Sequence, residues 1–229
     1  MRVSQLPWGV WCLTLGWSSV MVWASFGSVW PQAEFIDRYA FDPLSAHELF
    51  NSVSSLSQWF SFFSRAVTAQ FIHVDWFHLV GNAAYFFVFG VRVERRVGPF
   101  FLMLATTLIG TLAYALPALL SLQSGLVVAG ASGAVSGVLG LYWVVCSKEP
   151  IGFWLPLGMV PQRFKLPAWL LLGSWFGVQL IFALNATTYA TVAVTAHLSG
   201  FLLGLIFGGL FRVFESRQRL SKHKGFDYV

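Results

Sequence analysis

The stretch GASGAVSG, Gly130 to Gly137, places two serines among small residues in an otherwise apolar part of the chain. Small residues line the contacts between membrane helices, because they let two backbones approach closely. A serine hydroxyl in such a segment is also a candidate nucleophile wherever a base can accept its proton. The stretch therefore has two interpretations, helix packing and catalysis, and the rest of the chain has to decide between them.

The composition is that of a membrane protein. Of 229 residues, 57% are hydrophobic and 10% are charged, whereas soluble domains carry about 25% charged residues. A membrane helix needs about 20 apolar residues, and the sequence holds six such runs, at about 8–26, 70–91, 100–120, 125–146, 166–184 and 190–211. We therefore expect an all-α polytopic membrane protein, with residues 1–229 forming one domain of six spans.

The basic residues predict the orientation, because loops rich in Lys and Arg stay on the cytoplasmic side. Of the fourteen basic residues, only Arg38 and Arg65 fall on the other side. The remaining twelve are Arg2, Arg92, Arg95, Arg96, Lys148, Arg163, Lys165, Arg212, Arg217, Arg219, Lys222 and Lys224. Both termini are predicted to be cytoplasmic, with residues 212–229 as a basic tail. The net charge of +5 then reflects orientation and contact with anionic lipid, and no nucleic-acid partner is predicted.

Two segments outside the central spans admit alternatives. Span 1 is long and carries four tryptophans, which favours a retained anchor over a cleaved signal peptide. Segment 27–69 is too long for a turn and too polar to span the membrane. Its aromatic residues predict that it lies partly in the outer membrane interface.

Ser132 and His197 are predicted to lie at the same depth. Each is the eighth residue of its span, counted from 125 and from 190, and at 1.5 Å per residue each lies about 10 Å below the outer surface. Spans 4 and 6 run in the same direction. Histidine is the usual base for a serine nucleophile, so the matched depths predict a Ser132–His197 catalytic dyad.

Glycine stripes on the same two spans support this pairing. They are Gly133-x3-Gly137 with Gly140 on span 4 and Gly200-x3-Gly204-x3-Gly208 on span 6. Ser132 adjoins the first stripe, and His197 lies three residues before the second. Close packing of the two spans would bring base and nucleophile within hydrogen-bond reach.

Span 2 offers donors for a developing negative charge. His78 and Asn82 are four residues apart and share a helix face. With the backbone N–H of Ser132 they are predicted to form an oxyanion site. His73 is expected to have a structural role. A metal site at His73, Asp75 and His78, or a proton relay, is the alternative. Zinc sites use three or four well-placed ligands, so no metal or other cofactor is predicted.

These residues together resemble the rhomboid intramembrane serine proteases of bacterial type over about residues 69–211. The matching parts are Gly130-Ala131-Ser132-Gly133, Ala196-His197 followed by Gly200 and Gly204, the polar residues His73, His78 and Asn82, and Val93–Gly98 (VERRVG). The resemblance implies a six-span rhomboid-like bundle with a long, partly embedded first external loop.

The resemblance also implies an activity. Ser132 is expected as nucleophile, His197 as base without an acidic third member, and His78, Asn82 and the Ser132 N–H as the oxyanion site. The expected reaction is cleavage of membrane-protein helices near the outer face through an acyl-enzyme. Glu94 and Arg95 are expected to tie down the end of span 2, and span 5 is expected to form a lateral gate.

The sequence also departs from the family pattern. Many rhomboids have a tyrosine, stacked on the catalytic histidine, where this chain has Ser136, so the imidazole must be positioned by another group. Three alternative functions stay open: an inactive client-binding relative, a specialised protease for C-terminal anchors of secreted proteins, and a small transporter. A bacterial inner membrane is expected, and the sequence names neither substrates nor an oligomeric state.

Overall fold

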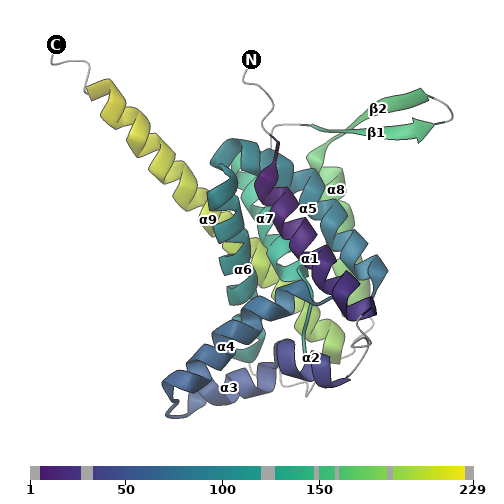
Figure 1. The fold of residues 1–229 in the computed structure, drawn as a ribbon. Helices are drawn as coiled ribbons and strands as arrows, with labels where there is room; N and C mark the ends of the chain where they lie inside the picture. Colours follow the sequence, from purple (N-terminus) through teal and green to yellow (C-terminus); the bar gives the residue numbers. More distant parts are fainter. Residues whose placement is uncertain are drawn as a thin grey trace.

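The computed structural model describes residues 6–26, 33–119, 127–146, 150–157, 160–184 and 188–224. Long helices dominate it (Figure 1). They are α1 (Trp8–Phe26), α5 (Trp76–Val97), α6 (Pro99–Leu119), α7 (Ser132–Cys146), α8 (Ala168–Leu184) and α9 (Thr188–Lys224). Each matches one of the six predicted spans in order, which confirms the all-α membrane bundle.

Helix α7 is the centre of the bundle. It packs against α5, α6 and α9, and nearly all its side chains are buried, including Leu139, Leu141 and Tyr142. Apolar side chains on the outside of the bundle, such as Leu202, Ile206 and Leu210 of α9, are exposed. A buried centre inside an apolar exterior is the arrangement expected of helices surrounded by lipid.

Length and hydropathy separate the helices into two groups. Three described helices are long and apolar enough to cross a membrane: Trp8–Phe26, Pro99–Leu116 and Val192–Arg219. A fourth candidate is the bent pair Leu56–Phe71 and Trp76–Val97, whose axes differ by 91°, counted as one span. Helix α7 and the apolar part of α8 are shorter.

The start of α7 differs from the predicted span 125–146, because the helix begins only at Ser132. Gly130 has a φ of +124°, a conformation that ends helical geometry and favours glycine. Val128 pairs with Phe41 as an isolated antiparallel bridge. Residues 127–131 are therefore non-helical, and Ser132 is the first residue of α7 rather than the eighth of a span. Residues 125 and 126 lie outside the described part of the chain.

The start of span 2 and the end of span 6 also differ from their predicted positions. Span 2 was predicted at 70–91, but α5 begins at Trp76, where Asp75 caps the helix by accepting from the His78 N–H at 2.7 Å. Span 6 was predicted to end at residue 211, but α9 continues to Lys224 into the predicted tail. The cause of the first shift is the cap, since an Asp side chain satisfies the unpaired N–H groups of a first turn.

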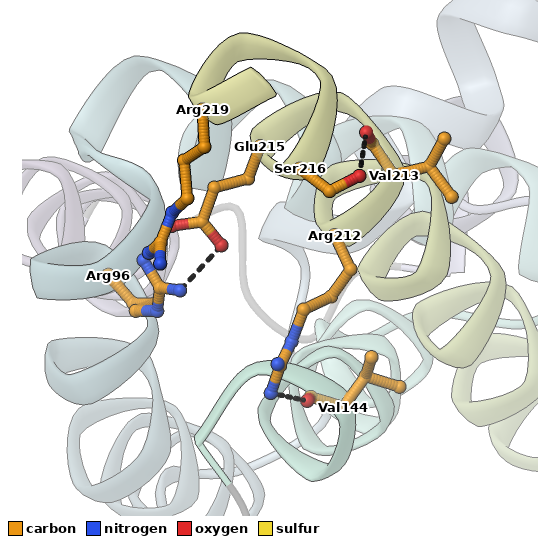
Figure 2. A network of polar contacts seen from close by, with 7 residues as sticks. All are labelled: Arg96, Val144, Arg212, Val213, Glu215, Ser216 and Arg219. Atoms are coloured by element: carbon orange, nitrogen blue, oxygen red, sulfur yellow. Dashed lines mark hydrogen bonds and ion pairs between the residues drawn. The ribbon is translucent and has the colours of Figure 1, made fainter. Parts of the chain in front are cut away.

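Polar contacts hold the extension of α9 against the bundle (Figure 2). Glu215 accepts two hydrogen bonds from Arg96 of α5, at 2.7 and 2.6 Å, and one from Arg219 at 2.8 Å. Arg212 donates to the Val144 carbonyl at the end of α7 at 2.8 Å. A bidentate Arg–carboxylate pair fixes geometry better than a single contact does, so these bonds stabilise the first turns of the extension.

The segment predicted to lie in the outer interface forms short helices. These are α2 (Ala33–Tyr39), α3 (Pro43–Asn51), α4 (Leu56–Thr68) and the 3-10 turn η1 (Ala69–Phe71). In Figure 1 they lie at one end of the bundle, opposite the start of α1 and the end of α9. Phe62 and Ala66 of α4 are buried, whereas Phe60 and Phe63 are exposed. An amphipathic helix of this kind suits a membrane interface.

A two-stranded hairpin is added to the helical bundle between α7 and α8. Its strands, β1 (Ile151–Leu157) and β2 (Val160–Leu166), are antiparallel and lie at the same end as the start of α1 (Figure 1). Arg92 of α5 donates to the Gly152 carbonyl at 3.2 Å. The hairpin therefore projects from the end of the bundle that lies opposite α2–α4, and Arg92 holds its base (Figure 1).

The first turn of α1 is capped from a distant helix. Glu94 of α5 is 5% exposed, and its carboxylate accepts from the backbone N–H groups of Gly9 at 3.2 Å and Val10 at 2.8 Å. A negative side chain at a helix N-terminus satisfies orphan donors and complements the helix dipole. Glu94 therefore ties α1 to α5, in addition to its place at the end of span 2.

We expect Glu94→Ala to lower the free energy of unfolding by about 1–3 kcal/mol, because two buried donors lose their acceptor. Glu94→Gln keeps one acceptor oxygen and should lose less. SDS titration of the purified protein measures the change, with Glu48→Ala as the control, since Glu48 is exposed. An unfolding curve of Glu94→Ala that overlays the wild type would contradict the role of this cap.

Candidate active site

Ser132 and His197 are in direct contact. Ser132 is the first residue of α7, and His197 lies within α9. The Ser132 Oγ and the His197 Nε2 are 2.6 Å apart, and both residues are partly buried. The distance is that of a hydrogen bond through which a hydroxyl donates its proton to an imidazole nitrogen.

The crossing of α7 and α9 makes this contact possible. A Cβ on Gly200 or Gly204 would collide with the carbonyl oxygens of Gly133 and Gly137, respectively, and a Cβ on Gly137 would lie 3.2 Å from the Gly200 oxygen. The two glycine stripes thus face each other with backbone against backbone. A serine side chain is short, so only such an approach lets it reach an imidazole on the neighbouring helix.

The non-helical residues before Ser132 are held by side chains and backbone from other elements. Gly130 donates its N–H to the Ala69 carbonyl at 2.9 Å, and its own carbonyl accepts from the Tyr114 hydroxyl at 2.5 Å. Val128 exchanges two backbone hydrogen bonds with Phe41, at 2.9 and 2.7 Å. Irregular backbone inside a membrane protein is stable only where protein satisfies it. These bonds therefore fix where α7, and hence Ser132, begins.

Gly130 also makes room for His78. A Cβ on Gly130 would lie 2.5 Å from the His78 Cε1 and 2.9 Å from its Nε2. Together with the positive φ, this close approach requires glycine two residues before the serine. The imidazole of His78 consequently lies against the backbone that leads into Ser132.

The polar residues expected from span 2 gather beside this backbone. His73 is buried, and its Nε2 accepts from the Ala131 N–H at 3.4 Å. The His73 and His78 rings are 5.1 Å apart. Among the described residues, no partner is found for the buried atoms His73 Nδ1, His78 Nδ1 and Asn82 Nδ2. Buried polar groups are normally paired, so the His78 and Asn82 atoms are candidates for contact with a ligand.

The side chains of His73, Asp75 and His78 are not arranged as three ligands of one metal ion. Asp75 uses its Oδ1 to cap α5, and His73 Nε2 contacts the backbone at Ala131. Within the ranges that the structure describes, no group of three or more His, Cys, Asp or Glu residues is arranged to hold a metal.

Helix α8 contributes two residues that the sequence analysis did not select. The Gln179 Oε1 makes a hydrogen bond with His197 Nδ1, the nitrogen that faces away from Ser132. The Trp175 indole lies 5.9 Å from the His197 ring. Its Nε1 donates to the Ser136 Oγ at 3.0 Å. The aromatic ring that position 136 lacks is thus supplied by the neighbouring helix.

A signal for Gln179 was present in the sequence. A polar residue at membrane depth usually faces the bundle interior and marks a functional site, and Gln179 interrupts the apolar run Leu166–Leu184. Applied to span 5, that rule selects Gln179, and Trp175 then lies one turn away on the same face. Both side chains are buried.

The chain is similar to known proteins over its membrane region. Residues 60–214 match the family model of the Rhomboid domain. The protein "Rhomboid-like protein 11, chloroplastic" of Arabidopsis thaliana is 32% identical over 169 residues, which cover 69% of this chain and 54% of the relative. The chain thus spans about half the length of that curated relative. Since the domain match covers more than half of the chain, this integral membrane protein belongs to the rhomboid family.

Proposed function

We propose that the protein is an intramembrane serine endopeptidase that cleaves transmembrane helices of other membrane proteins. The observation that carries the proposal is the 2.6 Å contact between the Ser132 Oγ and the His197 Nε2. It joins a nucleophile to a base on two helices that pack backbone against backbone. The Rhomboid domain match supports the same class of activity.

The reaction would proceed in two halves. His197 Nε2 accepts the proton as the Ser132 Oγ bonds to the substrate carbonyl carbon, and the carbonyl oxygen becomes an oxyanion. The tetrahedral intermediate then releases the amine, which takes the proton from His197 and leaves an acyl-enzyme. Water attacks this ester by the same route, with His197 again as base, and releases the acid and free Ser132.

The oxyanion would be held by groups around the start of α7. The Ser132 N–H belongs to a first helical turn, whose N–H groups lack partners within the helix, and the helix dipole favours negative charge there. The Asn82 amide and the His78 imidazole provide further polar atoms that are buried and unpaired within the described ranges. Donors already oriented toward developing charge lower the barrier most.

Removal of the Asn82 amide tests the oxyanion site. We expect Asn82→Ala to lower kcat by about 10²-fold, because one oxyanion donor is lost, with little change in KM. Initial cleavage rates in proteoliposomes measure both constants. Thr106→Val is the matched control, since the Thr106 hydroxyl is also buried without a partner in the described structure but belongs to α6. Equal effects of the two variants would contradict a catalytic role for Asn82.

The function itself is tested with the reconstituted full chain. Wild-type protein in vesicles should cleave a single-span test substrate and react covalently with a fluorophosphonate, and His197→Ala should lose both activities. A client-binding protein would bind the substrate without cleaving it or being labelled. A transporter would lose solute flux in His197→Ala without ever cleaving substrate. Either outcome would overturn the proposal.

The orientation and location are part of the same proposal. The start of α1 and the end of α9 lie at the same end of the bundle (Figure 1). The distribution of basic residues favours a cytoplasmic location for this end. The dyad would then be reached from the outer leaflet of a bacterial inner membrane. Cysteine labelling from either side of sealed vesicles, at a cysteine introduced in α3, tests this orientation.

A further inference from the structure

Gln179 links helix α8 to the candidate base. It is 5% exposed, and its side-chain oxygen faces His197 Nδ1. The other nitrogen of the same imidazole faces Ser132. The chain of contacts therefore runs from α7 through the imidazole of α9 to the amide of α8.

The second hydrogen bond of Gln179 fixes which end of the amide meets the histidine. The Gln179 Nε2 donates to the Trp175 carbonyl at 3.4 Å. A carbonyl oxygen can only accept, so the amide nitrogen belongs on that side and the amide oxygen on the side of His197. The alternative flip would place two acceptors against each other at Trp175.

This arrangement selects one form of the neutral imidazole. An amide oxygen accepts but does not donate, so His197 Nδ1 must carry the hydrogen. In a neutral imidazole the other nitrogen, Nε2, then holds the lone pair. That is the atom next to the Ser132 hydroxyl, and only the lone pair lets it take the serine proton.

Trp175 ties the same face of α8 to α7. Its indole donates to the hydroxyl of Ser136, which is fully buried. Trp175 and Gln179 are four residues apart and therefore share one helix face. The hydrogen bond to Ser136 fixes the register of α8 beside the dyad, and with it the position of the Gln179 amide.

We infer that Gln179 is a positioning residue, which holds His197 in the tautomer and orientation that the reaction needs. This inference rests on the proposed protease function. Gln179 would do the work of an acidic third member with an uncharged group, which avoids placing a carboxylate in an apolar setting. A glutamine with only a structural role would not determine which nitrogen of His197 carries the hydrogen.

The test compares Gln179→Leu, Gln179→Glu and the control Gln70→Leu in the full chain. Leucine fills similar space but accepts no hydrogen bond, so kcat should fall about 10- to 100-fold, as for other supporting hydrogen bonds, with KM unchanged. Glutamate keeps an acceptor oxygen for His197 Nδ1, so this variant should retain more of kcat than Gln179→Leu, with some loss caused by the buried charge. Gln70 is also buried, and its amide donates to Ala66 and Thr111 rather than to the dyad. Gln70→Leu should therefore alter stability but not kcat.

A spectroscopic readout separates this inference from the protease function. The chain holds five histidines, and 15N ring labelling in lipid nanodiscs, compared with His197→Ala, identifies the His197 signals. Wild type should show His197 protonated on Nδ1, and Gln179→Leu should lose that preference. Unchanged His197 signals in Gln179→Leu, or equal losses of kcat in the leucine and glutamate variants, would overturn the inference. A tautomer change in a protein that cleaves nothing would uphold the positioning and reject the protease.

Discussion

Ser132→Ala is expected to abolish proteolysis, with kcat lowered by a factor on the order of 10⁴ or more, as for nucleophile removal in other serine proteases. The physical reason is that no other atom at the start of α7 can form the acyl-enzyme. Initial cleavage rates of a single-span substrate in proteoliposomes measure the loss. Covalent labelling by a fluorophosphonate should disappear in parallel.

The matched control for this prediction is Ser199→Ala. Ser199 is a buried serine two residues beyond His197, and its hydroxyl donates to the Thr195 carbonyl within α9. Its removal deletes the same atom type close to the dyad without touching it, so near wild-type rates are expected. If both variants kept activity, or lost it equally, Ser132 would not be the nucleophile.

Gly204→Val is expected to disrupt the crossing of α7 and α9 and, with it, the dyad. A Cβ at this position would collide with the Gly137 carbonyl oxygen and lie 2.9 Å from the Leu141 nitrogen. Backbone cannot move aside as a flexible side chain can, so we expect a loss of about 3 kcal/mol in the free energy of unfolding. Residual folded protein should be inactive, because separated helices no longer bring the imidazole to Ser132.

Gly209→Val provides the comparison on the same helix. A Cβ there meets no described atom within 4 Å, so the change in helix propensity is the same but no contact is disturbed. SDS titration and cleavage rates at matched folded fraction are the two measurements. The close packing would be refuted by a Gly204→Val protein as stable and active as Gly209→Val.

The order of the helices could be predicted because membrane insertion imposes a local rule. Runs of about 20 apolar residues are visible in sequence whatever they pack against, and the six predicted spans correspond to α1 and α5–α9. Ser132 and His197 were selected as partners because each is the eighth residue of its predicted span. That count was numerically wrong for Ser132, since α7 begins there and residues 127–131 before it are non-helical.

The start of α7 escaped prediction because it depends on contacts between distant segments. The start of α7 is determined by Phe41, Ala69 and Tyr114, which bond to residues 128 and 130. The start of α1 was predicted correctly, but its cap by Glu94, 85 residues from Gly9, was not predicted. Hydropathy along the chain contains no information about these bonds, so the predicted span 4 extended upstream of Ser132. Glu94 was expected to tie down the end of span 2, and its contact with α1 was not predicted.

By itself the sequence determined that the protein is a membrane protein and predicted spans 2, 4 and 6 in parallel, with serine, histidine and glycine stripes on two of them. These properties follow from composition and from spacing within single helices. Only the tertiary structure decided that the two stripes face each other and that α8 places Gln179 and Trp175 against His197. The rotation of a helix about its axis is set by packing against its neighbours, and it is this rotation that turns a polar residue toward a base or toward lipid.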